Sequence, residues 1–231
     1  MVRKSFDQFM GQLKDQVLIL GSMVEQLTLD AVNALTQGDF AAAKAIYRQD
    51  LLINEKRFAI ENAVLSQIAT QQPMAHDLRV LTAILYVANE LERMGDYAKG
   101  IAKIAFHVSN EDLRIPVNEF QEMARLSIGM LHKSLSAFMD ENSVLASQIP
   151  NEDDQVDALY IKIYHIIVYS MIADPETIDQ ANYLLWVAHN LERMADRVVN
   201  ICERTLFICT GEYLEMDNDE DSVVSVINRY Q

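Results

Sequence analysis

The chain has 231 residues, of which 50% are apolar and 23% are charged, and its 34 acidic and 19 basic residues give a formal net charge of −15. This apolar content is enough for a sizeable core, which argues against wholesale disorder. The acidity argues against nucleic acids and anionic membranes as partners, because binding to both depends on Lys and Arg. It fits a protein that binds cations or meets a basic surface.

Targeting signals and membrane spans are not evident. The longest strongly apolar run without a charge, Ile163 to Ala173, is shorter than the roughly 20 residues that a membrane-spanning helix needs. Near the N-terminus, Asp7 interrupts any signal-like stretch. We therefore expect a cytoplasmic protein without direct membrane insertion, in which Cys202 and Cys209 are buried, reduced thiols.

The first hundred residues predict three helices. Apolar side chains recur every three or four positions from Phe6 to Ala34, as in a bundle-forming helix. Gly38 and Asp39 predict a stop and a new start, and a second helix then runs to about Gln71. Pro73 ends it, and the third helix carries a seam that includes many small side chains: Leu81, Ile84, Ala88, Leu91, Gly95, Ala98, Ala102 and Ala105.

Prolines divide the second hundred residues in a similar way. Pro116 is expected to open a fourth helix that runs through Met139 and beyond, and Pro150 to open a fifth. Pro175 precedes a sixth helix, which fades into Gly211 and an acidic tail. The pattern is three helices followed by three more.

The two halves are also related in sequence. Residues 87–96 read VANELERMGD, and residues 187–196, one hundred positions later, read VAHNLERMAD. The second helices of the halves match at an offset of 103, with the pairs Asp39/Asn142, Ala43/Ala146, Ile46/Ile149, Asp50/Asp153, Ile53/Val156 and Asn54/Asp157. We predict an all-α fold of two tandem, sequence-related three-helix bundles packed side by side, over residues 1–109 and 116–214, with an acidic tail over 215–231.

Acidic residues recur where a bundle should be apolar. Glu92 and Asp96 are four apart on one helix face, as are Glu192 and Asp196, a spacing that is slightly unfavourable for like charges. Asp50 and Asp153 fall on the apolar stripes of the neighbouring helices, and Asn54 and Asp157 follow one turn later. Antiparallel packing of these helices would give an oxygen-only cluster in each half, which suits hard cations such as Mg²⁺, Ca²⁺, Mn²⁺ or Fe³⁺.

Interpretations of these side chains without a metal ion also remain open. Glu92 and Asp96 could be solvated edge residues paired with Arg93 or Lys99. His189 lies one turn before Glu192, but its counterpart is Asn89, which favours an ordinary polar contact over a ligand role.

Catalytic motifs are not visible in the chain. The sequence has no Glu-x-x-His pair, no Gly-rich phosphate loop and no Gly-x-Ser-x-Gly elbow. We therefore expect no catalytic residues and no enzyme activity.

The chain resembles the PhoU family of accessory regulators of phosphate-specific transport. The resemblance rests on the Leu-Glu-Arg-Met-x-Asp segments at 91–96 and 191–196, the QQPMAHDLR turn at 71–79 and the Asp-x-x-Ile/Val-Asn/Asp segments that start at 50 and 153. It implies two three-helix bundles, a homodimer and multinuclear metal clusters of iron, zinc, manganese or magnesium. The implied ligands are Asp50, Asn54, Glu92 and Asp96 in the first half, and Asp153, Asp157, Glu192 and Asp196 in the second.

Two departures from the family pattern affect these clusters. Asn54 replaces a carboxylate that the second half keeps, so the first cluster is expected to bind metal more weakly. Arg197 stands where relatives often carry His, and the resemblance implies that it lowers the charge or occupancy of the second cluster.

By this resemblance the protein is a non-enzymatic regulator. It would damp phosphate uptake through the transporter's ATPase subunit and repress the phosphate-starvation response by holding a membrane sensor kinase inactive. Three alternatives remain: a metal-binding helical adaptor of a different transporter, a metal-dependent hydrolase, and a structural dimer whose acids bind no metal.

Overall fold

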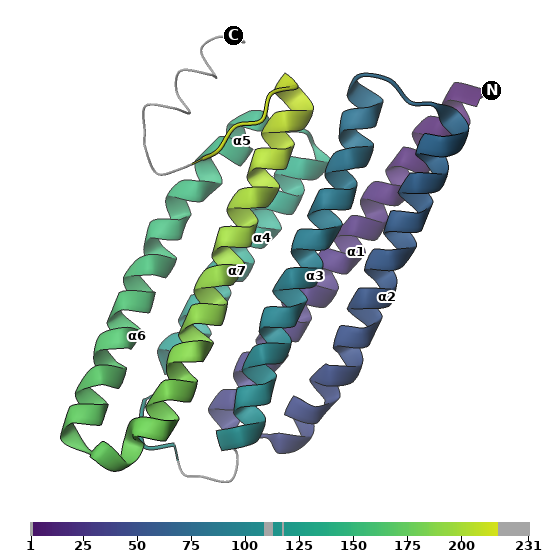
Figure 1. Cartoon of the computed structure of the whole chain (residues 1–231). Helices are drawn as coiled ribbons and strands as arrows, with labels where there is room; N and C mark the ends of the chain where they lie inside the picture. The colour runs from purple at the N-terminus through teal and green to yellow at the C-terminus, as the bar shows by residue number, and fades with distance from the viewer. Residues whose placement is uncertain (1, 109–112, 117, 217–231) are drawn as a thin grey trace.

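The structure is a computed structural model that describes residues 2–108, 113–116 and 118–216, and within these ranges it contains helices and no strands. The first half forms α1 (Val2–Gln37), α2 (Phe40–Gln71) and α3 (His76–Val108). The second half forms α4 (Asn118–Met139), α5 (Ser143–Gln148), the 3₁₀ helix η1 (Ile149–Glu152), α6 (Asp153–Ala173), the 3₁₀ helix η2 (Pro175–Thr177) and α7 (Ile178–Thr210). The long helices α1, α2 and α3 of the first half and α4, α6 and α7 of the second form two neighbouring groups (Figure 1), which confirms the predicted fold class. Most of the predicted acidic tail lies outside the described residues.

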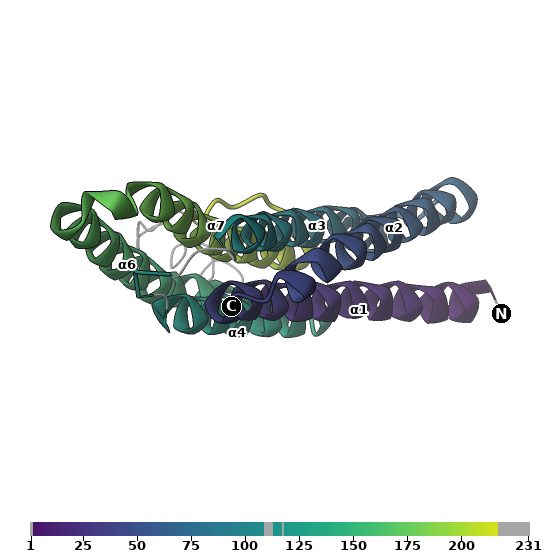
Figure 2. The ribbon, with the colours of Figure 1, turned by 90° about the horizontal axis from the view of Figure 1, so that it is seen from below.

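The two bundles share an interface made mainly by α3 and α7. Helix α3 contacts α1, α2 and α7, and α7 contacts α3, α4 and α6. Seen from below in Figure 2, α3 and α7 lie together near the middle, whereas α2 and α6 lie toward opposite ends of the molecule. The candidate metal residues of each half therefore lie between a central helix and a peripheral one.

The predicted apolar stripes form the core. On α1, the side chains of Val17, Leu20 and Val24 are fully buried. On α3, a Cβ atom added to Gly95 would lie 3.3 Å from two side-chain carbons of Ile53 on α2. Gly95 therefore lets α2 and α3 approach closely. This approach places Asp50, one turn before Ile53 on α2, beside α3.

The start of the second half's peripheral helix differs from the prediction. Helix α4 ends at Met139, and α5 begins at Ser143 after the N-cap Asn142, whose side chain accepts a hydrogen bond from the Leu145 N–H. Pro150 does not open a helix of its own but lies in η1, between α5 and α6. Because proline cannot donate a backbone hydrogen bond, the continuous helix of the first half becomes three shorter pieces here.

The thiol prediction is partly wrong. Cys202 and Cys209 are both free, and Cys202 is buried as expected. Cys209 is exposed near the end of α7, and its Sγ donates a hydrogen bond to the backbone oxygen of Glu141 at 3.1 Å. The end of α7 is therefore less enclosed than its apolar pattern suggests.

Two helical stretches are long and apolar enough to cross a membrane when length and composition alone are considered. They are Phe6–Gln37, near the N-terminus, and Ser143–Ala173. Half of the first stretch's apolar window is buried in the bundle, as in a core helix, but only 17% of the second's is. The second stretch is also interrupted by η1, and in its α6 part only Val156, Ile163 and Ile167 are buried.

Candidate metal centres of the two repeats

The first repeat brings three carboxylates together between α2 and α3. Asp50 on α2 is 1% exposed, and Glu92 and Asp96 lie on the facing part of α3. Burial raises the pKa of Glu92, and the charges of Asp96 and Asp50 raise it further. Burial and then the charge of Asp50 also raise the pKa of Asp96. Asp50 is therefore close enough to Glu92 and Asp96 to raise the pKa values of both.

Cations of the chain itself accompany this first cluster. The Nζ of Lys99 donates a hydrogen bond to Asp50 Oδ2 at 2.6 Å. Lys99 thus forms its ion pair with the buried Asp50 rather than with Glu92 or Asp96 at a solvated edge. The positive charge of Arg57 acts on Glu92 in the direction that lowers its pKa. Asn54 turns its amide toward its own helix, where Nδ2 donates to the backbone oxygen of Asp50 at 3.1 Å.

The second repeat gathers four carboxylates between α6 and α7. Burial and then the charges of Asp157, Asp196 and Glu192 raise the pKa of Asp153 to about 7. Burial followed by the charge of Asp196 raises the pKa values of both Asp157 and Glu192. All four predicted residues of this half therefore lie within electrostatic reach of one another.

Two buried oxygen atoms of the second cluster lack hydrogen-bond donors. They are Asp153 Oδ1 and Glu192 Oε2, which no hydrogen bond satisfies within the described part of the chain. His189 Nδ1 lies 3.5 Å from Glu192 Oε2, and the His189 ring meets Trp186 edge-on. His189 thus makes the expected polar contact without satisfying that oxygen as a hydrogen bond.

Arg197 does not face the second cluster, so its expected effect on that cluster is wrong. Its Nη1 donates to Glu90 Oε2 at 3.4 Å, and its Nη2 donates to Tyr97 Oη at 3.4 Å. Both partners lie on α3, across the interface between the repeats. Adjacent residues on a helix point about 100° apart, which separates Arg197 from its neighbour Asp196.

Three residues that matter here were not assigned these roles by sequence reasoning. Lys99 and Arg57 provide positive charge at the first cluster, and the buried Glu90 anchors Arg197. A position-by-position comparison of the halves contains a signal for all three. At the offsets of 100 and 103, their counterparts are the uncharged Val199, Tyr160 and Asn190.

The donor sets differ in how well they suit a metal ion. In the second cluster, buried carboxylate oxygens without donors are what a hard cation requires. In the first cluster, the buried carboxylate is already bound by Lys99. Among the residues that the structure describes, no three His, Cys, Asp or Glu side chains are gathered closely enough to hold one ion. Direct binding would therefore require rotation of these side chains.

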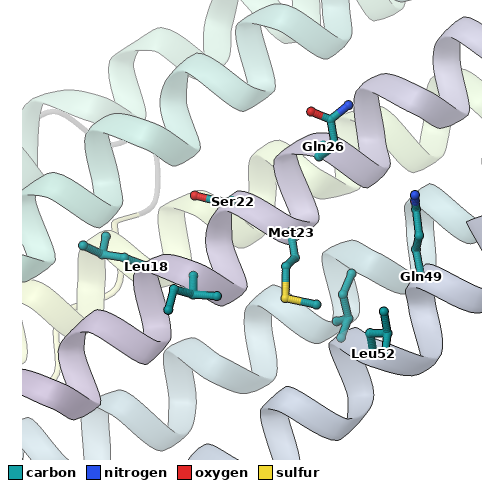
Figure 3. Close-up of a pocket in the computed structure, with 8 residues that line it drawn as sticks. Leu18, Ser22, Met23, Gln26, Gln49 and Leu52 are labelled. Carbon is teal, nitrogen blue, oxygen red and sulfur yellow. The ribbon is translucent and has the colours of Figure 1, made fainter.

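A groove elsewhere in the first repeat has a different chemistry. It has a volume of about 490 Å³, lies between α1 and α2 and is lined mainly by apolar side chains. Figure 3 shows Leu18, Met23 and Leu52 there, with Gln26 and Gln49 at its polar edge. None of the residues that line it is acidic, in contrast to the two carboxylate clusters.

Comparison with known proteins agrees with the duplicated fold. The profile of the PhoU domain matches twice, over residues 17–105 and 120–205. The chain is 33% identical over 219 residues to the "phosphate-specific transport system accessory protein PhoU homolog" of Clostridium acetobutylicum, covering 94% of this chain and all of that protein. A homologue of the same description from Streptococcus pneumoniae is 32% identical over 216 residues, covering 94% of this chain and all of that protein.

Solved structures agree as well. The crystal structure of PhoU from Pseudomonas aeruginosa superposes with a TM-score of 0.83 at 28% identity, over 90% of this chain and all of that one. The phosphate transport system regulatory protein PhoU from Streptococcus pneumoniae gives a TM-score of 0.84 at 32% identity, over 91% of this chain and all of that one. Sequence and structure are thus similar over both repeats, and the chain belongs to the PhoU family.

Proposed function

We propose that this chain is the accessory regulator of a phosphate-specific transport system. It damps phosphate uptake through the transporter's ATPase subunit and represses the phosphate-starvation response through a membrane sensor kinase. The observation that carries this proposal is the similarity over both repeats to accessory proteins of that transport system.

The protein acts in the cytoplasm as a homodimer, without inserting into the membrane. The net charge of −15 supports a partner surface that is basic rather than an anionic lipid surface. The largely exposed apolar side of α6 supports contact with another protein.

The second part of the proposal is that carboxylates at the α2–α3 and α6–α7 interfaces bind metal ions. The oxygen-only donor set supports magnesium, manganese or iron(III) as the bound metal. Zinc is a further candidate, on the ground of the family resemblance alone. A bound cation would neutralise clustered carboxylates and join a peripheral helix to a central one. The candidate ligands are those named above, with Asp153 and Glu192 carrying the buried oxygens that lack donors.

A non-enzymatic role is proposed over a metal-dependent hydrolase. A hydrolase positions its metal ions in a substrate cleft with an open coordination site. The acids here lie instead along the α2–α3 and α6–α7 contacts, with Asp96 and Asp157 exposed at the surface. Robust phosphatase turnover by purified protein with added Mn²⁺, lost in Asp196→Ala, would support the hydrolase instead.

The test of the regulatory role is complementation of a bacterium that lacks its own PhoU. We expect the chain to restore repression of a phosphate-starvation reporter in phosphate-rich medium and to lower phosphate uptake. Leu91→Asp is the matched loss-of-fold control, because Leu91 is fully buried at the centre of α3. The protein could be expressed and folded and still change neither the reporter signal nor phosphate uptake. That result would favour the alternative of an adaptor for a different transporter.

A further inference from the structure

The two acidic clusters differ in the charges that surround them. At three equivalent positions, the first repeat has Lys99, Arg57 and Asn54, where the second has Val199, Tyr160 and Asp157. Each difference makes the first cluster less negative than the second. Arg93 and Arg193 are equivalent and do not contribute to the contrast.

In the first repeat, the ammonium group of Lys99 already satisfies the most buried carboxylate. The Asp50 side chain is 2% exposed, and its Oδ2 accepts the hydrogen bond from Lys99 Nζ at 2.6 Å. The Lys99 side chain is 35% exposed, so its charged end is partly solvated while it neutralises Asp50. A buried carboxylate needs a counter-charge and hydrogen-bond donors, and Lys99 supplies both from within the chain.

In the second repeat, the equivalent side chain cannot do this. Val199 has no donor and no charge, and Tyr160 replaces the guanidinium of Arg57. Among the described residues, none donates a hydrogen bond to the buried Asp153 Oδ1 or Glu192 Oε2. The nearby cation Arg193 is bound to Asp196, with Nη1 donating to Oδ2 at 3.0 Å, and it leaves those two oxygens unsatisfied.

We propose that Lys99 is a built-in cation that takes the place of a metal ion in the first repeat, so that this chain binds cations only at Asp153, Asp157, Glu192 and Asp196. The inference rests on the proposed metal binding and narrows it to one repeat. The first cluster is then a permanent ion pair that fastens α2 to α3. The second depends on cations from solution.

This asymmetry makes α6 the helix that responds to metal. Within α6 only Val156, Ile163 and Ile167 are buried, so its apolar attachment to the bundle is narrow. A cation between α6 and α7 would strengthen that attachment. Helix α2, at the opposite end of the molecule in Figure 2, would be unaffected because its ion pair is always present.

The test measures bound Mn²⁺ by equilibrium dialysis and elemental analysis on full-length protein purified without a metal-affinity tag. Wild-type protein should lose its Mn²⁺ in Asp196→Asn and keep it in Asp96→Asn. Lys99→Met should increase bound Mn²⁺ about twofold by freeing the first cluster for a cation, and Asp96→Asn in that background should abolish the gain. Lys103→Met is the matched control, because this exposed lysine lies one turn further along α3 and should change nothing.

The reciprocal variant is Val199→Lys, which places an ammonium at the equivalent position of the second repeat. It should lose the bound Mn²⁺ seen in wild-type protein. Hydrogen exchange gives a second readout. In wild-type protein, Mn²⁺ should slow the exchange of backbone amide hydrogens in α6 but not in α2. In Val199→Lys, Mn²⁺ should slow amide exchange in neither helix. Circular dichroism checks that each variant is folded, and Lys99→Met with Asp96→Asn tests the inference if Val199→Lys does not fold.

Two results would overturn the inference. Only the second would also reject the proposed metal binding. Wild-type protein that loses Mn²⁺ in both Asp96→Asn and Asp196→Asn binds metal in both repeats, so the role of Lys99 is wrong and metal binding stands. Protein that binds no Mn²⁺, Mg²⁺, Fe³⁺ or Zn²⁺ in any variant, Lys99→Met included, removes the proposed metal binding together with this inference.

Discussion

Gly38 and Glu141 occupy the same left-handed backbone position in the two repeats, with φ angles of +65° and +51°. After each of them, the next N–H bonds to a carbonyl five residues back, from Asp39 to Ala34 at 2.9 Å and from Asn142 to Ala137 at 2.8 Å. This is the Schellman ending of a helix, in which glycine is preferred because it has no Cβ. The second repeat keeps the geometry with a residue that is strained there.

The Glu141 side chain offsets that strain by joining the repeats. Its Oε1 accepts a hydrogen bond from Lys14 Nζ of α1 at 2.8 Å, and its Oε2 lies 2.7 Å from His76 Nε2 of α3. The variants Glu141→Gly and Glu141→Gln separate the two effects. Gln keeps the strained backbone and loses the charge, whereas Gly loses the side chain and relieves about 1 kcal/mol of backbone strain.

We expect Glu141→Gln to lower the free energy of unfolding by about 1 kcal/mol, the usual size of a partly buried ion pair. Glu141→Gly should be about as stable as Glu141→Gln or more stable, although it has no side chain. Urea unfolding at pH 7 measures both values. A Gly variant clearly less stable than the Gln variant would show that position 141 is not strained.

The Glu141 ion pair also predicts a dependence on pH. Burial raises the pKa of Glu141, but the hydrogen bond and charge of Lys14 and the contact with His76 outweigh it, so the pKa lies below the ordinary value of 4.5. The folded state therefore holds this proton less tightly than the unfolded state. The stabilisation is complete above about pH 4.5 and is lost as the pH falls through the lower folded pKa.

The measurement is the difference in unfolding free energy between wild type and Glu141→Gln from pH 7 to pH 3. The difference should shrink toward zero as the pH falls below about 4.5, because the protonated Glu141 then carries no charge, like Gln. Lys14→Met is the control, because removing the donor should abolish most of the pH-dependent difference. A difference that grows as the pH falls from 4.5 to 3 would contradict the assignment.

The helix starts that follow these turns are also equivalent. Asp39 accepts a hydrogen bond from the Ala42 N–H at 2.9 Å, and Asn142 accepts one from the Leu145 N–H at 3.0 Å. We expect Asp39→Ala and Asn142→Ala each to cost about 1 kcal/mol of unfolding free energy, because each leaves a helix N–H without its partner. Asp39→Asn is the conservative control and should cost much less.

Thermal unfolding followed by circular dichroism measures the cap variants. If the two repeats unfold together, both substitutions should lower the melting temperature of the same single transition by similar amounts. Two separate transitions, each sensitive to one cap alone, would show that the repeats unfold independently.

The helical fold was predictable because its signal is repeated along each helix. The apolar residues spaced three and four apart from Phe6 to Ala34, and the row of small side chains on α3, mark the buried face at every turn of these helices. The offset of 103 also pairs Asp39 with Asn142, which are both N-caps in the structure. The start of the second half's peripheral helix was predicted at the wrong place, because Pro150 was expected to open it, whereas α5 begins at Ser143 and Pro150 lies within η1. The apolar pattern continues through η1, and only the backbone shows that this proline is accommodated inside a 3₁₀ turn.

Side-chain partners at the clusters were less predictable than the clusters themselves. A shift of one residue turns a helical side chain by about 100°, so proximity in sequence does not give proximity in space. Arg197 follows Asp196 yet contacts Glu90 and Tyr97, and Lys99 reaches across to Asp50 on another helix. These pairings depend on the crossing of two helices, which a single helix's pattern does not contain.

The contact between Glu90 and Arg197 is a polar contact across the interface between the repeats. Glu90 is 3% exposed, and its Oε2 accepts hydrogen bonds from Arg197 Nη1 at 3.4 Å and Asn200 Nδ2 at 3.1 Å. Its counterpart Asn190 lies against Gly100, the counterpart of Asn200, where an added Cβ would be 3.0 Å from the amide nitrogen. Of these two equivalent contacts between α3 and α7, the one at Glu90 is therefore charged and the one at Asn190 is neutral.

We expect Glu90→Gln to lower the unfolding free energy by about 2 kcal/mol, because it leaves the partly buried guanidinium of Arg197 without its counter-charge. Arg197→Met should cost a similar amount by leaving the Glu90 carboxylate buried with only Asn200. The double variant should cost less than the sum of the two, since it removes both unpaired charges. Urea unfolding of the four proteins measures this coupling, and strictly additive costs would mean that Glu90 and Arg197 do not depend on each other across the repeat interface.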